Sequence, residues 1–274
     1  MIIVRTAEEL LEAKKALLGS IGFVPTMGAL HHGHLSLINR AKNENEHLIV
    51  SIFVNPTQFL EDEDLDAYPR KDEADIKICE LAKVDILFMP TIEDMYEKDE
   101  LHISAPAIRG YILEGEKRPK HFDGMLQIVM KLINLTGANR AYFGKKDAQQ
   151  LVLIEQMVEN YFMNIDIVPC EIVRDETGLA LSSRNAYLTK EEKIRALCLS
   201  HSLKCATNMI VSGELNAGII KTKIIEVLSE ADNIEYVAIV DREFNILEKI
   251  EIGNTIILVA AWIGKPRLID NIWI

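Results

Sequence analysis

Short apolar segments alternate with amphipathic segments over the first 170 residues, and this alternation constrains the fold more than any other feature. The apolar, β-prone segments are Ile2–Val4, 21–24, 48–54, 84–88, 140–143 and 165–168. Segments with apolar residues at helical spacing lie between them, at 7–19, 34–44, 71–82, 122–136 and 147–160. Continuous apolar strands that alternate with helices are typical of a parallel sheet buried on both faces. We therefore predict an α/β domain with helices on both faces of its sheet.

A second domain is predicted from a change of pattern beyond Arg174. There, two helical segments lie at 190–211 and 214–230. Three β-rich runs follow them, at 236–240, 255–261 and 267–272. This order predicts a smaller α+β domain, and we place the two domains at residues 1–172 and 173–274. Segment 98–120 carries Pro and Gly without periodicity, so we expect an excursion beside the sheet.

The composition excludes several classes of partner. The chain is 49% hydrophobic and carries a formal net charge of −12, which argues against broad contact with nucleic acid, because such contact needs many Lys and Arg. No apolar run approaches the ~20 residues of a membrane span, so we expect a cytoplasmic protein without a membrane partner. The four cysteines lack C-x-x-C spacing and are expected to be reduced thiols. The acidic run at 61–64 lacks the spacing of a calcium loop and is interpreted as a solvated loop.

The strongest chemical signal is the stretch Pro25-Thr26-Met27-Gly28-Ala29-Leu30-His31-His32-Gly33-His34, which follows the apolar segment 21–24. Its histidines lie at a strand-to-helix crossover, where parallel sheets bind ligands and where helix N–H groups face phosphate. Imidazoles donate to phosphoryl oxygens, and the spacing of His31 and His34 predicts that both act on one ligand. We interpret His32 as a bystander. Zinc is disfavoured because no third ligand stands at the usual spacing.

Three further polar clusters are candidates for binding a ligand. They are Asn55 and Gln58 within 53–59, Gly144, Lys146, Asp147 and Gln150 within 143–150, and Ser182, Ser183 and Arg184 within 181–185. Amides suit a small polar metabolite, whereas lysine, serine and arginine suit phosphates. Each cluster alone also has a plainer interpretation: a turn at Pro56, a solvated helix start, or a helix cap with a surface arginine.

Together these motifs closely resemble the pantoate–β-alanine ligase family, the pantothenate synthetases, over essentially the whole chain. The family patterns P-T-M-G-x-L-H-x-G-H, F-V-N-P-x-Q-F, G-x-K-D-x-Q-Q and S-S-R-N stand at 25–34, 53–59, 144–150 and 182–185. H-x-G-H also marks the wider nucleotidylyltransferase superfamily, and segment 181–184 is similar to its second signature loop. The resemblance implies a Rossmann-like domain that binds ATP and pantoate, followed by a C-terminal lid domain.

The reaction that this resemblance implies joins (R)-pantoate to β-alanine at the expense of ATP. The pantoate carboxylate attacks the α-phosphorus, and the amine of β-alanine then attacks the pantoyl adenylate, which gives pantothenate, AMP and pyrophosphate. This chemistry belongs to vitamin B5 and coenzyme A biosynthesis. The family also implies Mg2+ alongside ATP, and a homodimer.

The resemblance assigns His34 to donating a proton or hydrogen bond to the phosphates, with His31 beside it. Implied catalytic residues are His31, His34, Lys146, Ser182, Ser183 and Arg184. Implied ATP-binding residues are Thr26, Met27, Gly28, His31, Gly33, His34, Gly144, Lys146, Asp147, Val173, Leu181, Ser182, Ser183 and Arg184. Implied residues for pantoate and β-alanine are Met27, Asn55, Gln58 and Gln150. No metal ligand is assigned, because the family's metal contacts do not transfer cleanly to the acidic region 61–75.

Two departures from the family and two competing hypotheses remain. Leu181 stands where methionine is frequent, and Asp123 stands where a basic or small residue is common, so Asp123 is left out of the site. A plain nucleotidylyltransferase is one alternative, although two neutral amides suit a hydroxy acid better than a phosphate. A nucleotide-binding regulatory module without chemistry is the other, and it would bind ATP without turnover.

Overall fold

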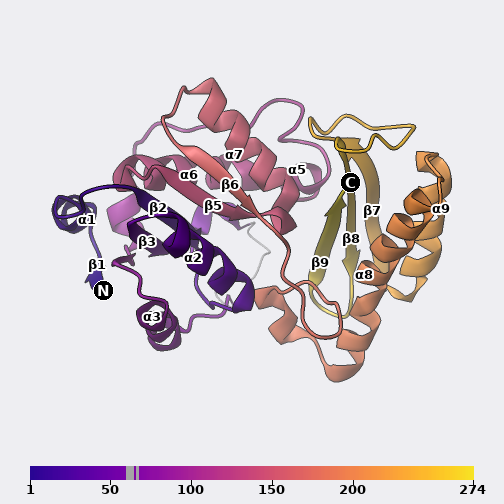
Figure 1. Ribbon diagram of the computed structural model, residues 1–274, viewed down its shortest axis with the longest axis horizontal. Coiled ribbons are helices and arrows are strands. Elements are labelled where there is room, and N and C mark those ends of the chain that lie inside the picture. Colours follow the sequence, from indigo (N-terminus) through magenta and orange to yellow (C-terminus); the bar gives the residue numbers. More distant parts are fainter. Residues whose placement is uncertain (60–64, 66–67) are drawn as a thin grey trace. The chain divides into compact units, whose positions relative to one another are not determined.

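The computed structural model describes residues 1–59, 65 and 68–274, and contacts divide the chain into two compact units (Figure 1). The first unit comprises residues 1–145 and 149–171, and the second comprises 146–148 and 172–274. The acidic run at 61–64 lies outside the described residues.

The first unit is built on a six-stranded sheet in which every neighbouring pair is parallel. Its strands are β1 (Ile2–Val4), β2 (Ile21–Thr26), β3 (His47–Ile52), β4 (Ile86–Phe88), β5 (Arg140–Gly144) and β6 (Asp166–Cys170). The spatial order is β1-β4-β3-β2-β5-β6, so the order reverses between β2 and β5. Ligands of open α/β sheets bind at the carboxyl ends of strands beside such a reversal. The segments that follow β2, β3 and β5 carry the predicted site residues of this unit.

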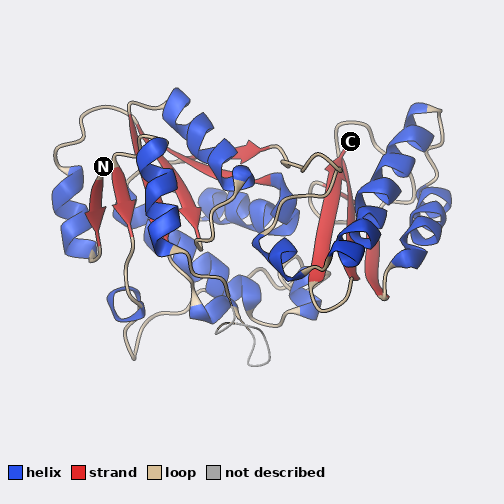
Figure 2. Ribbon diagram, turned by 90° about the horizontal axis from the view of Figure 1, so that it is seen from below, coloured by secondary structure: helices blue, strands red, loops and turns tan. Residues whose placement is uncertain are grey.

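Helices cover the sheet on both faces, as Figure 2 shows. They are α1 (Ala7–Lys14), α2 (His32–Glu44), α3 (Asp72–Leu81), α4 (Ile92–Met95), α5 (Glu114–Lys117), α6 (His121–Thr136) and α7 (Ala148–Asn160), with 3-10 turns η1 (Pro56–Gln58) and η2 (Lys145–Asp147). On one face, Ile38 and Ala41 of α2 and Cys79 of α3 share a buried cluster with strand residues such as Val50. Helices α1 and α6 pack against each other and against strands. The predicted α/β fold class is confirmed.

Local capping signals fix several helix ends. Thr6 and Glu9 form a capping box at the start of α1, and Gly137 ends α6 in the left-handed conformation with φ 58°. Helix α1 is shorter than the predicted 7–19: it ends at Lys14, and the chain turns through Gly19 before β2. Gly124 allows α6 to approach η1, because a Cβ at this position would lie 2.3 Å from the Thr57 carbonyl oxygen.

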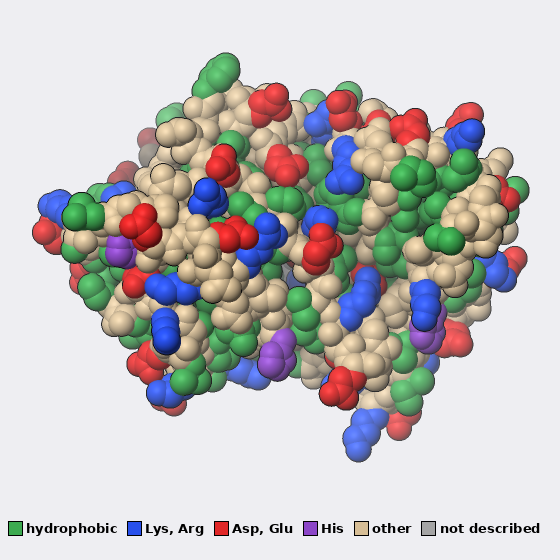
Figure 3. Space-filling model, viewed as in Figure 1, with side chains coloured by type: hydrophobic (Ala, Val, Ile, Leu, Met, Phe, Trp, Pro, Cys, Tyr) green, Lys and Arg blue, Asp and Glu red, His purple; other side chains and the backbone are tan. Residues whose placement is uncertain are grey.

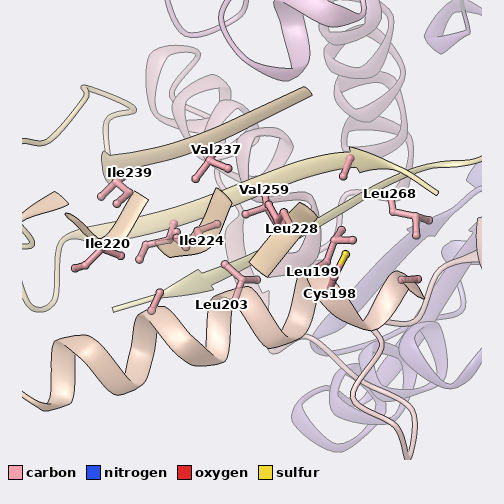
Figure 4. Packing of buried hydrophobic residues seen from close by; sticks show 14 of the residues in the cluster. Cys198, Leu199, Leu203, Ile220, Ile224, Leu228, Val237, Ile239, Val259 and Leu268 are labelled. Carbon is pink, nitrogen blue, oxygen red and sulfur yellow. The ribbon is translucent and has the colours of Figure 1, made fainter. Parts of the chain in front are cut away.

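The second unit packs two helices on a three-stranded antiparallel sheet. Its elements are η3 (Ser183–Tyr187), α8 (Lys190–Val211), α9 (Ala217–Val227), η4 (Leu228–Glu230), β7 (Asn233–Asp241), β8 (Thr255–Trp262) and β9 (Arg267–Trp273), with strand order β7-β8-β9. Figure 4 shows Leu199 and Leu203 of α8 pointing toward the sheet, where they share a buried cluster with Ile224 of α9 and Val259 of β8. This apolar layer gives the unit a core of its own.

The surface carries both signs of charge. Figure 3 shows acidic and basic side chains intermingled with hydrophobic ones over the visible face. No helix in the described part of the chain combines the length and apolar character needed to span a bilayer.

Candidate active site

His31 and His34 form a reciprocal cap at the start of α2. His31 is the N-cap residue, and its Nδ1 accepts a hydrogen bond from the backbone N–H of Gly33 at 3.1 Å. The backbone N–H of His31 in turn donates to Nδ1 of His34 at 3.3 Å. Because each Nδ1 is an acceptor, the proton of each neutral imidazole lies on Nε2. The cap therefore makes the Nε2 atoms of His31 and His34 hydrogen-bond donors.

This cap also occupies backbone groups that the sequence suggested for phosphate. The N–H groups of Gly28, Ala29, Leu30, His31 and Gly33 all donate within the chain: to Thr26 Oγ1, Asp75 Oδ2, Asp75 Oδ1, His34 Nδ1 and His31 Nδ1. The expectation that this helix N-terminus offers open N–H groups is wrong at these positions. The Nε2–H groups of His31 and His34 are further hydrogen-bond donors of this segment. His32 is exposed, as befits a bystander.

Thr26 and Gly28 shape the turn between β2 and the histidines. The Thr26 hydroxyl donates to the Ser51 carbonyl oxygen at 2.8 Å and accepts from Gly28, which ties the end of β2 to β3. Gly28 has φ 84°, a conformation that glycine adopts without steric cost. Thr26 and Met27 accordingly enter the turn at the carboxyl end of a central strand, as predicted.

Asn55 and Gln58 form a buried amide pair beyond β3. Asn55 is 1% exposed, and its Nδ2 donates to Gln58 Oε1 at 3.2 Å and to the Gly124 carbonyl at 3.1 Å. Its Oδ1 accepts from the Thr57 hydroxyl at 3.0 Å and from the Tyr96 hydroxyl at 2.7 Å. This arrangement fixes the Gln58 amide with Oε1 toward Asn55, so Nε2 is the end that can donate to a ligand. Asn55 thus holds Gln58 in place.

Three residues that sequence reasoning missed support this pair. The Tyr96 hydroxyl holds Asn55, and burial raises the pKa of Tyr96, so it remains a donor. The Gln58 carbonyl accepts from His121 Nδ1 at 2.8 Å and from the Arg118 guanidinium at 3.2 Å. These residues lie 41 to 63 positions from their partners, so no local pattern could have found them.

The two glutamines at the start of α7 have different tasks. Gln149 is buried, and its amide binds the backbone of Arg109, Ile112 and Glu114, which fixes the 98–120 excursion. Gln150, the predicted ligand residue, is half-buried on the first turn of α7, after Gly144 ends the central strand β5. Asp123, which was left out of the site, accepts from the Ala105 N–H at 2.8 Å and also braces the excursion.

The remaining predicted residues belong to the second unit. Lys146 Nζ lies 3.6 Å from Asp147 Oδ1, and the Lys146 carbonyl accepts from Asn271 Nδ2 of β9 at 2.8 Å. Residues 174–180 form a turn in which the Val173 carbonyl accepts from the Leu181 N–H at 3.0 Å. The Arg174 guanidinium grips the buried Asp270 carboxylate through two contacts, at 2.6 and 2.9 Å.

Ser182, Ser183 and Arg184 stand where this turn meets η3. The Ser182 hydroxyl accepts from the Arg184 N–H at 3.3 Å, so Ser182 is the N-cap of η3. Asn185 Nδ2 donates to the Ala180 carbonyl at 2.9 Å. The plainer interpretation of a helix cap thus describes Ser182. Within residues 1–59, 65 and 68–274, no cluster of three His, Cys, Asp or Glu side chains is placed to hold a metal ion.

Comparison with known proteins places this constellation in a family. The sequence model described as Pantoate-beta-alanine ligase matches residues 2–273. The chain belongs to the pantoate-beta-alanine ligase family. A curated pantothenate synthetase of Aliarcobacter butzleri is 61% identical, and one of Campylobacter curvus is 57% identical, each over the full length of both chains. Membership makes the chain an enzyme, a ligase that joins pantoate to β-alanine.

Solved structures of this ligase family share the fold. A crystal structure of pantothenate synthetase from Thermus thermophilus matches with a TM-score of 0.94 at 38% identity and covers 99% of each chain. The pantoate-beta-alanine ligase of Francisella tularensis, complexed with beta-gamma ATP and beta-alanine, matches with a TM-score of 0.81 at 39% identity, covering 99% of this chain and 97% of that one. An ATP ligand and β-alanine thus bind to a relative of similar architecture.

Proposed function

We propose that the chain condenses (R)-pantoate with β-alanine through a pantoyl adenylate and releases AMP and pyrophosphate. The observation that carries this proposal is the position of three donors after adjacent strands. His31 and His34, which follow β2, have Nε2–H donors, and Gln58, which follows β3, has an amide donor fixed by Asn55. Imidazole donors suit phosphate, and an amide donor suits the oxygens of a hydroxy acid. A free carboxylate resists amines, so activation by AMP supplies the leaving group.

In the first step we assign phosphate contacts to His34 and His31. Their Nε2–H donors would bind phosphate oxygens as charge shifts toward pyrophosphate, which stabilises the transition state more than the ground state. Thr26, Met27, Gly28, Gly33 and Gly144 are proposed to shape the ATP pocket. We assign this role to the neutral imidazoles, which already donate from Nε2. A proton on either Nδ1 would break the hydrogen bond that orients that ring.

The pantoate site is proposed around Gln58 and Gln150. Gln58 would donate from Nε2 to a pantoate oxygen, and Gln150 and Met27 would complete the pocket. For Asn55 we propose a role through Gln58, because its amide already binds Gln58, Gly124, Thr57 and Tyr96. β-Alanine then attacks the acyl carbon in a site whose main task is orientation.

We further propose that residues 1–172 form the ATP- and pantoate-binding domain and that 173–274 form a lid domain. Lys146, Ser182, Ser183 and Arg184 would bind the polyphosphate, Asp147 the ribose, and Val173 and Leu181 the adenine. The brace between Arg174 and Asp270 supports this assignment, since it holds the turn that carries Val173 and Leu181. Closure of a lid excludes water from the adenylate.

Mg2+, a homodimer and a cytoplasmic location complete the proposal. The described residues offer no cluster of three metal-ligating side chains, so Mg2+ is proposed to enter on the phosphate oxygens of ATP, and no step is assigned to it. The homodimer follows from the family resemblance, and the cytoplasmic location agrees with the expected reduced cysteines.

The test is an assay of ATP, Mg2+ and D-pantoate with and without β-alanine, in which AMP is quantified and pantothenate is followed by mass. The proposal predicts equal amounts of AMP and pantothenate, formed only with both substrates. Nucleotide transfer to a phosphorylated acceptor would favour the nucleotidylyltransferase hypothesis. ATP binding without either product would favour the regulatory module.

A further inference from the structure

A buried carboxylate from α3 holds the loop that leads into the H-x-G-H segment. Asp75 is 1% exposed, and its two oxygens divide between consecutive residues of the loop. Oδ2 accepts from the Ala29 N–H at 2.8 Å, and Oδ1 accepts from the Leu30 N–H at 2.8 Å. Charge-assisted hydrogen bonds of this kind are roughly twice as strong as those between neutral groups.

The loop needs such an anchor because its backbone is unusual. Gly28 and Ala29 both have positive φ, 84° and 49°, and the left-handed conformation is sterically unfavourable for alanine. Consecutive N–H groups in such a turn converge on an anion. The carboxylate is close beneath the turn, since a Cβ on Gly28 would lie 3.1 Å from Asp75 Oδ2. The Asp75 carboxylate therefore binds the N–H groups of this turn in the way that a phosphate binds the N–H groups of a glycine-rich loop.

The peptides that Asp75 anchors are directly followed by the first histidine of the cap. Leu30 immediately precedes His31, whose backbone N–H and Nδ1 both belong to the reciprocal cap with His34 and Gly33. A shift of the Leu30 peptide would move the His31 N–H away from His34 Nδ1. The same shift would release the constraint that keeps the proton of His34 on Nε2.

We propose that Asp75 is a positioning residue that fixes the orientation and Nε2–H form of His31 and His34 by anchoring the Ala29 and Leu30 peptides. This inference rests on the proposed function for its kinetic part only, because the hydrogen-bonding state of the two rings is observable in the free protein. Asp75 does not contact substrate in this account. Its effect on catalysis passes entirely through the loop.

The burial of Asp75 makes its replacement by asparagine a fair test. Burial raises the pKa of Asp75, whereas the hydrogen bonds from Leu30 and Ala29 lower it. Asparagine has nearly the same shape and carries no charge, so Asp75→Asn removes the cost of burying a carboxylate. It leaves one acceptor and turns an NH2 group toward one backbone N–H. Asp72→Asn, on the exposed first turn of the same helix, makes the same charge change and is the matched control.

The decisive readout is the 15N spectrum of the imidazoles in wild type, Asp75→Asn and Asp72→Asn. In wild type and Asp72→Asn we expect His31 and His34 in the Nε2–H form with Nδ1 as acceptor. In Asp75→Asn we expect that signature to be lost or averaged at both rings. We also expect kcat/KM for ATP to fall about 100-fold, with the Kd for pantoate unchanged.

Stability and folding are monitored in parallel. Asp75→Asn is expected to unfold cooperatively with a Tm within about 5 °C of wild type. If it does not fold, Asp75→Ser, whose shorter side chain removes both carboxylate oxygens, replaces it. Retention of the wild-type imidazole signature and of wild-type kcat/KM in the folded variant would overturn the proposal. Failure of wild type itself to form pantothenate would instead count against the proposed function, and the spectra would still decide the role of Asp75.

Discussion

The rings of His31 and His34 lie 4.1 Å apart between centroids, and each ring accepts at Nδ1 from a backbone N–H of the same turn. The pair therefore combines two roles that are usually separate, because the same side chains cap α2 and present Nε2–H donors. Ser, Thr, Asp and Asn are the usual N-caps, and none of them carries a ring with a second nitrogen that can donate. The cap itself thus determines which proton each histidine can give.

His34→Ala should abolish most of the adenylation activity and leave the fold intact. Loss of one preorganised donor to the phosphates costs about 100- to 1000-fold in kcat. The lost half of the cap should lower the free energy of unfolding by only about 1 kcal/mol. Steady-state kinetics and thermal melts measure both effects. His32→Ala, an exposed neighbour in the same turn, is the control and should behave as wild type. Unchanged turnover in His34→Ala would remove His34 from the mechanism.

Gln58→Glu should weaken pantoate selectively. Asn55 binds Oε1 of Gln58 and so leaves Nε2 as the donor of that amide, whereas glutamate would present an oxygen to an anionic substrate. Loss of a hydrogen bond to a charged group costs about 1.5–3 kcal/mol, which corresponds to an increase in KM for pantoate of about 10- to 100-fold. The KM for ATP serves as the internal control and should stay constant. An equal rise in the KM for pantoate and the KM for ATP would mean that Gln58 does not bind pantoate specifically.

Asp270→Asn should disturb the turn that carries Val173 and Leu181. Arg174 donates twice to the buried Asp270 carboxylate, and removal of one partner of a largely buried pair lowers the free energy of unfolding by about 3 kcal/mol. We expect a higher KM for ATP with unchanged pantoate binding. The control is Asp232→Asn, which breaks an exposed pair with Arg195 and should cost less than about 1 kcal/mol. Equal effects of the two variants would argue against a special role for this brace.

The buried Tyr142 should make the free energy of unfolding fall as the pH rises in alkaline solution. Burial raises its pKa to about 12, from an ordinary value of 10.0. Between these two values the unfolded chain loses the phenolic proton and the folded chain keeps it, so the free energy of unfolding falls as pH rises from 10.0 toward about 12. Absorbance of tyrosinate and chemical denaturation at several pH values measure the effect. Tyr142→Phe should lose this tyrosine's share of the slope, and an unchanged slope would contradict the assignment.

Sequence patterns predicted the parts of the structure that depend on neighbours in the chain. The capping box of Thr6 and Glu9 and the left-handed helix end at Gly137 are of this kind, because each signal lies within one turn of its effect. The strand positions were predicted because continuous apolar segments must be buried on both faces. The start of α2 was predicted two residues late, since histidine is not a usual N-cap.

The supporting contacts of the site could not be predicted in this way. Asp75 binds residues 45 and 46 positions away, and Tyr96 binds Asn55 across 41 positions. Such pairs arise only when the sheet order brings distant segments together, and a single sequence carries no signal for them. The sequence analysis singled out Gln150, but it could not show that Gln149 binds the backbone of Arg109, Ile112 and Glu114, because these partners lie 35 to 40 positions away.

The most direct test of the central claim is the fate of an 18O label in the pantoate carboxylate. If pantoate attacks the α-phosphorus and β-alanine then displaces AMP from the acyl carbon, the bridging carboxylate oxygen leaves with AMP. Mass spectrometry of the products should therefore show one 18O atom in AMP and one in pantothenate when both carboxylate oxygens are labelled. Unlabelled AMP, with the second label in pyrophosphate or in water instead, would contradict the pantoyl adenylate and the roles assigned to His31, His34 and Gln58.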